Sequence, residues 1–263
     1  MLQPDLVPPS PRPPPAAADA RRAEVLARLD EVMDPELDRS VAEMGFLCEL
    51  GIDGGTVDLA FRLPTYWCSA NFAFLMAEDM RAALERLPWV DEARVRLLDH
   101  FAARRINAGV AARLGFEDAF RGEAAGDLAA IRRAFEEKAF LGRQDRLVEA
   151  LAAREGLAAA LALTVAALER LADGNDAALR PLALRYLQLR RRFGGRAGPS
   201  DPAVVRLDGT PVAPADYPAH RREARRVRGA AEANAELCRI QLAARYAEAG
   251  TAPFLTASDE DEE

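Results

Sequence analysis

Apolar residues recur along the first third of the chain at spacings that alternate between helix and strand. Residues 25–33 place apolar side chains three and four positions apart, which is the period of one helix face. Residues 46–63 alternate apolar and polar positions on both sides of an Asp-Gly-Gly turn at 53–55, which predicts a β-hairpin. A second helical stripe covers 72–87, and 93–97 alternate again. The pattern predicts an α+β domain in the order α-β-β-α-β, with two helices on one face of a small three-stranded sheet.

The second half of the chain carries helical periods throughout. These stripes predict an all-helical C-terminal region over residues 121–257, ending in a long helix that begins near Tyr217. Residues 1–20 contain seven of the 17 prolines and no periodic apolar pattern, which predicts a disordered Pro-rich tail. Residues 258–263 form an acidic tail. The α+β domain is therefore expected over residues 21–120.

Net charge, cysteine content and the distribution of apolar residues make some partners and cellular locations less expected than others. The 263 residues carry a net charge of −7, which argues against nucleic acid as the main partner. Three unclustered cysteines do not suggest a disulfide framework and favour a reducing compartment. Neither a signal segment nor an apolar run of about 20 residues is present, so we expect a cytoplasmic protein with no membrane partner.

Cys68 is distinguished by its position. It follows the second strand and a short loop, 64–67, and a helical stripe begins directly behind it. The positive end of a helix dipole and free N–H groups favour the thiolate, which binds metals or attacks electrophiles. One thiolate does not complete a metal site, so further ligands would come from another protein, a second copy in a homodimer or other side chains. The alternative is a half-buried cysteine that only packs.

Other residues with metal-binding side chains give weaker signals. Cys48 lies on the inward face of its strand and Cys238 on an apolar helix face, so both are expected to pack in a core. His100 ends the third strand, where it could approach the cysteine loop. From the residues alone, Asp34 and Glu36 flank a proline that ends the first helix, and the glutamate is a surface carboxylate.

Sequence signatures of enzymes are missing. The chain has no phosphate-binding loop, no dinucleotide-binding turn, no His-Glu-x-x-His and no Cys-x-x-Cys. With two histidines and no evident catalytic dyad, we expect that the protein is not an enzyme.

Several motifs occur together in one specific order. Asp-Pro-Glu-Leu at 34–37 is followed by Ser-Val-Ala-Glu-Met-Gly-Phe-Leu at 40–47, by the hairpin and by the cysteine that opens a helix. In this order and spacing, residues 21–100 resemble the PaaD/SufT-type metal–sulfur (iron–sulfur) cluster assembly domain. The segment 100–110 and the helices beyond it are similar to a subset linked to bacterial diiron monooxygenases.

The sequence departs from the family pattern around the cysteine. The family threonine, four positions before the cysteine, is replaced by Pro64, and the family proline after the cysteine is replaced by Ser69. Thr65 is the candidate to supply the missing hydroxyl. Tyr66 and Trp67 are bulkier than the usual loop residues, which suggests a more closed pocket or one specialised for a single client.

The resemblance implies a maturation factor. Family members are implicated in delivering or maturing iron–sulfur clusters, and some are encoded beside multicomponent oxygenases. By analogy, Cys68 would transiently bind iron or an iron–sulfur cluster and pass it to a client metalloprotein. One alternative is an adaptor or chaperone without metal binding of its own; another is a thiol redox factor, which the lack of a resolving cysteine weakens. Further candidates for metal or client contact are Asp34, Glu36, Thr65 and His100.

Overall fold

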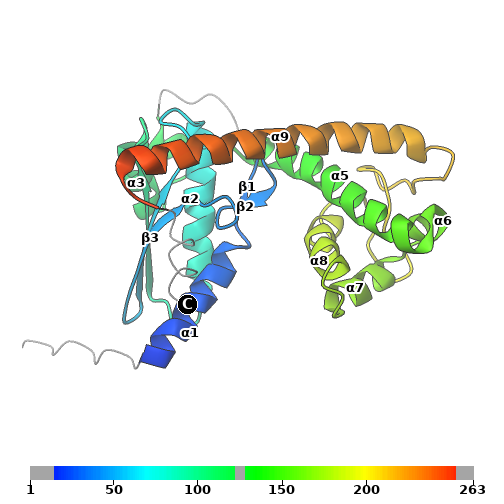
Figure 1. The fold of residues 1–263 in the computed structure, drawn as a ribbon, viewed down its shortest axis with the longest axis horizontal. Coiled ribbons are helices and arrows are strands. Elements are labelled where there is room, and N and C mark those ends of the chain that lie inside the picture. The colour runs from blue at the N-terminus through cyan, green and yellow to red at the C-terminus, as the bar shows by residue number, and fades with distance from the viewer. Residues whose placement is uncertain (1–14, 122–127, 253–263) are drawn as a thin grey trace, which may run out of the picture. The chain divides into compact units, whose positions relative to one another are not determined.

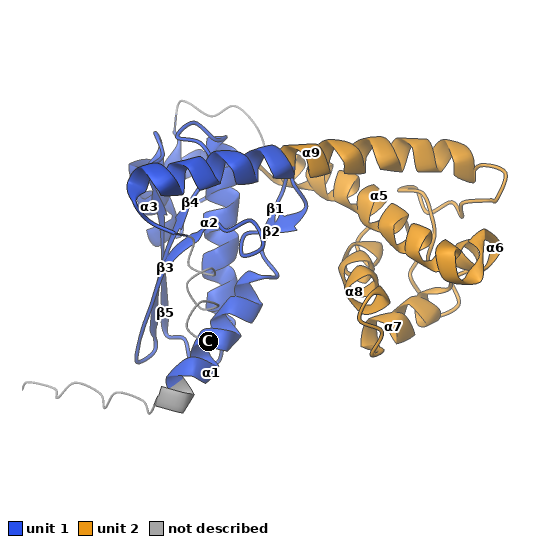
Figure 2. Ribbon diagram, in the orientation of Figure 1, with its two compact units in different colours: residues 1–125, 235–263 blue, residues 126–234 orange. Residues whose placement is uncertain are grey.

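A computed structural model describes residues 15–121 and 128–252 of the chain. The chain divides into two compact units, residues 1–125 with 235–263 and residues 126–234, which are described separately below (Figure 2). The predicted acidic tail, 258–263, lies outside the described residues, as does most of the predicted Pro-rich tail. Within the described ranges, no helix is long and apolar enough to cross a membrane.

The first unit contains the predicted α+β domain. Its order and small sheet confirm the predicted α-β-β-α-β arrangement (Figure 1), and two further short helices follow it in the chain. The helices α1 and α2 pack against each other, and α2 also packs against β5. The elements are α1 (Pro15–Leu29), β1 (Met33–Asp34), β2 (Arg39–Ser40), β3 (Leu47–Asp53), β4 (Thr56–Arg62), α2 (Ala70–Leu84), β5 (Glu92–Leu98), α3 (Ala103–Ala111) and α4 (Phe116–Ala119).

The sheet has the order β3-β4-β5 and combines both kinds of pairing. β3 and β4 form the predicted antiparallel hairpin, closed at Asp53 and Thr56 around Gly54, whose φ of 57° suits a glycine. β4 and β5 are parallel, with Leu59 opposite Val95, so α2 is the crossover between them. This crossover places the loop before α2 at the end of β4.

The ends of the first helix differ from the prediction. α1 begins at Pro15, so the expected tail is wrong for residues 15–20, where alanines favour a helix and proline is tolerated in the first turn. α1 ends at Leu29 and not at the proline turn, because Met33 and Asp34 form the strand β1, which pairs with β2. Apolar residues at helical spacing, such as Val32, are still buried as predicted.

At each edge of the three-stranded sheet, a side chain forms hydrogen bonds with the backbone. The amide of Asn107, on α3, accepts a hydrogen bond from Leu97 N at 2.8 Å and donates one to Leu97 O at 3.0 Å. At the β3 edge, the hydroxyl of Tyr246 donates to Gly45 O at 2.8 Å and lies 3.4 Å from Leu47 O. Side chains thus satisfy backbone groups that a neighbouring strand would otherwise pair with.

Tyr246 belongs to the last helix, α9 (Tyr217–Ala249), whose final part completes the first unit. The prediction of one helical region over 121–257 therefore needs correction, since residues 235–249 contribute to the α+β unit. Ala235, Leu242 and Tyr246 of this segment are buried at helical spacing. The pattern showed an amphipathic helix, but its partner could not be read from the sequence.

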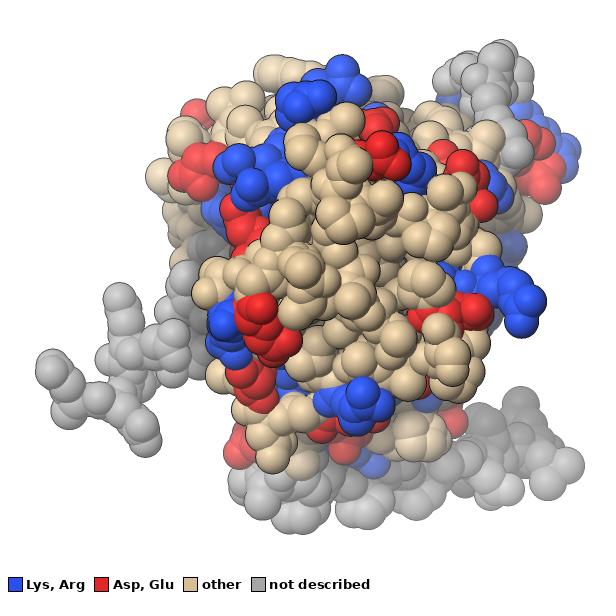
Figure 3. Space-filling model, turned by 90° about the vertical axis from the view of Figure 1, so that its right-hand side faces the viewer, with Lys and Arg blue, Asp and Glu red and all other residues tan. Residues whose placement is uncertain are grey.

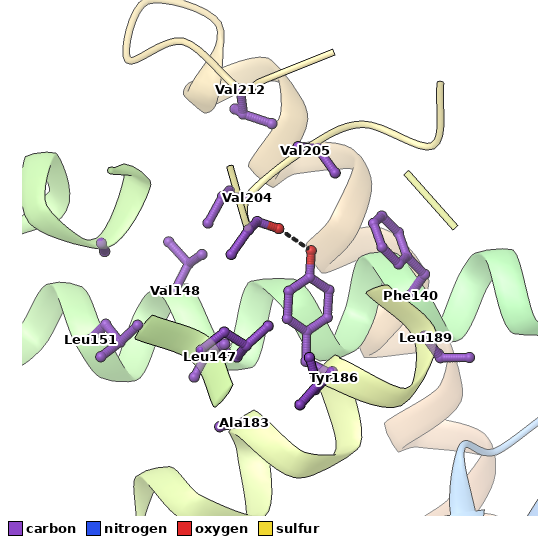
Figure 4. Packing of buried hydrophobic residues seen from close by; sticks show 14 of the residues in the cluster. Phe140, Leu147, Val148, Leu151, Ala183, Tyr186, Leu189, Val204, Val205 and Val212 are labelled. Carbon is purple, nitrogen blue, oxygen red and sulfur yellow. Dashed lines mark hydrogen bonds between the residues drawn. The ribbon is translucent and has the colours of Figure 1, made fainter. Parts of the chain in front are cut away.

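The second unit is all-helical, as predicted. Tyr186 lies at the centre of its apolar core and donates a hydrogen bond from its hydroxyl to Ala203 O at 2.7 Å (Figure 4). Gln144 donates to the same hydroxyl at 2.6 Å, and its side-chain oxygen lies 2.5 Å from Nε2 of His220, so this buried polar network is paired. The helices are α5 (Leu128–Glu155), α6 (Leu157–Leu161), α7 (Val165–Asp173), α8 (Leu179–Arg190) and the first part of α9.

The charges on one face of the molecule are mixed. Among the described residues that Figure 3 shows, basic and acidic side chains are interspersed around a broad area of uncharged residues.

Candidate functional site

The site is built around the loop that joins β4 to α2. Cys68 lies in this loop, half-buried, two residues before the first residue of α2. The hydroxyl oxygen of Thr65 is 3.1 Å from the Cys68 sulfur. A hydroxyl at this distance can donate a hydrogen bond to a thiolate. Thr65 therefore places a hydroxyl group beside the sulfur, one position later in the loop than Pro64.

His100 holds this loop against the end of β5. Its Nε2 lies 2.7 Å from the carbonyl oxygen of Cys68, and its Nδ1 accepts a hydrogen bond from Ala102 N at 3.2 Å. A carbonyl only accepts and an amide N–H only donates, so the ring is the neutral tautomer with hydrogen on Nε2. Burial lowers the pKa of His100, against the hydrogen bond to Cys68, which raises it.

This arrangement gives His100 a positioning role. Both ring nitrogens contact the backbone, and the residue is only 5% exposed. A metal ligand needs a nitrogen lone pair, which the bond from Ala102 N already occupies. In this geometry His100 contacts the carbonyl oxygen of Cys68 and so connects the cysteine loop to the end of β5.

Asp34 is a buried carboxyl group and not part of a helix stop. It lies on β1 and is 7% exposed, and its Oδ1 accepts hydrogen bonds from the N–H groups of Glu36 and Leu37, both at 2.9 Å. Burial dominates over these bonds and raises the pKa of Asp34 to about 6. Glu36, in the same turn, is exposed. The turn therefore holds one buried carboxyl group, that of Asp34, and one exposed carboxyl group, that of Glu36.

The third cysteine of the first unit, Cys238, comes from the C-terminal helix α9. It lies half-buried on the part of α9 that joins the first unit. Burial, with smaller contributions from the charges of Asp34, Cys68 and Glu36, raises its pKa to about 11. Periodicity predicts that Cys238 faces inward, but no local signal indicates what it faces.

The remaining cysteine, Cys48, contacts α9. Its sulfur lies 3.3 Å from the hydroxyl of Tyr246 and 3.6 Å from Phe46 O. It is half-buried on β3, next to a bulge between Leu47 and Glu49, and burial raises its pKa. The predicted packing role thus includes a polar contact. All three cysteines are free thiols.

The described residues do not by themselves form a complete metal site. Over 15–121 and 128–252, no three His, Cys, Asp or Glu side chains are grouped as a metal ion would require. What the loop presents is one thiol, that of Cys68, with the hydroxyl oxygen of Thr65 3.1 Å from its sulfur. Such a set supplies part of a coordination shell for a thiophilic metal.

Aromatic side chains beside Cys68 are exposed. Tyr66 is 53%, Trp67 74% and Phe101 56% exposed. The rings of Tyr66 and Phe101 are 6.4 Å apart, and Phe101 N donates to Tyr66 O at 3.0 Å, which joins the loop to the segment after β5. Exposed aromatic groups are enriched at protein interfaces. We call Tyr66, Trp67 and Phe101 the aromatic rim.

Comparison with known families finds a match within the first unit. Residues 22–96 match the family described as iron-sulfur cluster assembly protein, which confirms the resemblance found in the sequence. The match includes Asp34, Glu36 and Cys68, whereas His100 and Cys238 lie beyond it. It supports a role in iron–sulfur cluster assembly in general. No curated protein matches the chain.

Proposed function

We propose that this chain is an iron–sulfur cluster maturation factor that binds iron or a cluster transiently through Cys68 and passes it to a client metalloprotein. The observation that carries the proposal is the free thiol of Cys68 beside the hydroxyl of Thr65, in the loop before α2. It lies inside the part of the chain that matches the assembly family. In this proposal the protein is not an enzyme, and iron or the cluster is its cargo.

The chemistry of transfer favours an incomplete site. Iron–sulfur clusters are held by four ligands, usually thiolates, so a site with fewer ligands leaves coordination positions for the client. Thiol ligands bind metal as thiolates and release protons, so affinity rises with pH. A hydrogen bond from Thr65 would stabilise the sulfur charge while the metal is absent. Cargo held in this way is bound but can still be exchanged.

Client docking is proposed at the aromatic rim. Rim residues lie immediately before Cys68 and after His100, so a protein that covers them also reaches the thiol. Burial of aromatic side chains contributes strongly to interfaces. We propose a multicomponent oxygenase as the client, since the sequence of residues 100–110 is similar to the subset of the family linked to such enzymes.

The test is anaerobic reconstitution of the full chain with ferrous iron and sulfide. Absorption spectra and metal analysis are compared for the wild type, Cys68→Ala and Cys48→Ser. We expect iron binding in the wild type and in Cys48→Ser, because Cys48 contacts Tyr246 and lies on β3, outside the loop before α2. Cys68→Ala should lose most of it. Circular dichroism checks that each variant is folded.

The competing function is an adaptor that binds the client without metal. The aromatic rim favours it, because an interface of that kind needs no thiol. Equal iron contents in wild type and Cys68→Ala, or none in either, would argue for the adaptor. A client then still binds, and Trp67→Ala should weaken that binding while Cys68→Ala leaves it intact.

A further inference from the structure

Arg245, on the part of α9 that completes the first unit, joins two segments of the α+β domain. Its Nη1 donates a hydrogen bond to Leu63 O at 2.7 Å, and its Nη2 donates one to Asp99 O at 2.8 Å. Leu63 follows β4 and begins the loop that contains Cys68, whereas Asp99 follows β5. One planar guanidinium therefore bridges the ends of these two parallel strands.

Asp99 has a backbone conformation that needs such support. Its φ of 48° lies in the left-handed region, which is uncommon for a residue other than glycine and persists where surrounding contacts hold it. Its carboxylate accepts a hydrogen bond from Nε of Arg62 at 2.8 Å and lies 2.7 Å from Nη2 of the same guanidinium. Arg62 thus holds the side chain of Asp99, while Arg245 holds its carbonyl group.

The turn after β5 is connected in its next two residues to the cysteine loop. His100 contacts the carbonyl oxygen of Cys68 through Nε2 at 2.7 Å, and Phe101 N donates to Tyr66 O at 3.0 Å. Both contacts run from the segment after β5 to the loop after β4. The two hydrogen bonds of Arg245 lie at the base of this connection, where the loop and the turn each leave the sheet.

We propose that Arg245 is a positioning residue for Cys68, which fixes the cysteine loop in the form that takes up metal by bridging the ends of β4 and β5. The inference rests on the proposed function and assigns a role in it to a residue of α9, beyond the matched residues 22–96. Arg245 acts through the backbone of the loop and does not touch the cargo. The end of the C-terminal helix is then a working part of the assembly domain.

A guanidinium suits this task better than an ammonium group. It is planar and donates from several nitrogens in fixed directions, so it can hold two carbonyl oxygens at once, whereas the ammonium group of lysine acts as a point charge. Arg245→Lys therefore keeps the charge but loses the geometry of the bridge. Comparison of Arg245→Lys with Arg245→Ala separates an effect of charge from an effect of position.

The first test is hydrogen exchange of the full chain without metal. In Arg245→Ala we expect the amides of residues 65–69 and 100–102 to exchange at least about tenfold faster than in the wild type, because the loop and the turn open more easily. The amides of the β3–β4 hairpin should change less than about twofold. Arg245→Lys should behave like Arg245→Ala. The matched control is Arg239→Ala, an arginine of the same helix whose ion pair is with Glu43, and it should leave the loop unchanged.

Three results of this test would overturn the inference. One is equal exchange of the loop in the wild type and in Arg245→Ala. Another is an equal acceleration over the whole first unit, which would mean that the arginine only stabilises the fold. The third is wild-type exchange in Arg245→Lys, which would mean that the charge matters and the bridge does not.

The second test is the anaerobic reconstitution with ferrous iron and sulfide. Arg245→Ala keeps the thiol of Cys68, yet we expect its apparent affinity for iron to fall at least about tenfold, because affinity falls with the fraction of molecules whose loop has the binding conformation. Arg239→Ala should bind like the wild type. If Arg245→Ala and the wild type bind iron equally, the proposed function stands and this inference fails. If the wild type binds no iron, the proposed function fails and this inference fails with it.

Discussion

Asp34 is a buried carboxyl group whose ionised form is costly, so Asp34→Asn should stabilise the first unit near neutral pH. The side chain is 7% exposed, and its Oδ1 accepts hydrogen bonds from Glu36 N and Leu37 N. Asparagine has an amide oxygen that can accept the same two bonds, and it carries no charge. The substitution therefore removes the ionisation and keeps the turn.

The magnitude follows from the pKa. Burial raises the pKa of Asp34 from 3.8 to about 6, whereas the unfolded chain ionises near 3.8. Between these values the folded protein binds more protons than the unfolded one, so its stability falls as the pH rises. One pKa unit corresponds to about 1.4 kcal/mol, which gives a cost of about 3 kcal/mol above pH 6. We expect Asp34→Asn to gain up to about 3 kcal/mol at about pH 8 and almost nothing near pH 4.

Tryptophan fluorescence during unfolding in urea measures the difference in stability between the wild type and Asp34→Asn in the first unit. Both tryptophans, Trp67 and Trp89, belong to the first unit. Trp89 is half-buried and donates from Nε1 to Glu24 of α1 at 2.7 Å, so its environment changes when this unit unfolds. Unfolding curves between about pH 4 and pH 8 give the free energy of unfolding for wild type and variant.

The control is Glu36→Gln, which removes a charge from the same turn at an exposed position. We expect it to change the stability by less than about 0.5 kcal/mol. If Asp34→Asn were less stable than the wild type at about pH 8, or if the difference were the same at every pH, the reasoning from burial would be refuted.

Two further substitutions test other contacts. His100→Ala should cost the first unit about 1–3 kcal/mol in the same fluorescence assay, because the carbonyl of Cys68 loses its donor. Since burial lowers the pKa of His100, wild-type stability falls as the unfolded histidine protonates, so the loss should shrink below about pH 6.5 and a constant loss would contradict this. Tyr186→Phe should cost the second unit about 1–3 kcal/mol, because Ala203 O loses its buried donor. Circular dichroism measures this loss, since both tryptophans lie in the other unit; an unchanged transition would contradict it.

The sequence predicts the elements of the first unit well because each is amphipathic with its own period. The hairpin, the crossover helix and the last strand all lie where their patterns indicate. The end of α1 could not be predicted in the same way. Val32 and Met33 continue its helical spacing, yet Val32 O accepts a bond from Val41 N and Met33 pairs with Ser40. These hydrogen bonds are made with a later segment of the chain. The helical spacing of apolar residues gives no information about such partners.

The site is predictable only where its parts are close in the chain. Thr65 and Cys68 are neighbours in one loop, so the hydroxyl that replaces the family threonine could be identified. His100 is predicted near that loop, but its exact bonds, which leave no nitrogen lone pair for metal, need the structure. Cys238 gives only an inward-facing position on a helix. Its partners depend on how α9 packs, which periodicity does not report.

The side chains at the two edges of the sheet also protect the protein from self-association. A strand edge with unpaired backbone groups can add a strand from another molecule and so begin aggregation. The Asn107 amide forms the two hydrogen bonds to Leu97 that a neighbouring strand would form, and the Tyr246 hydroxyl contacts the carbonyl oxygens of Gly45 and Leu47 at the start of β3. Since Tyr246 lies near the end of α9, a chain cut before it would leave the backbone groups at the start of β3 open to pairing with another molecule. An intact end of α9 thus closes one route to aggregation.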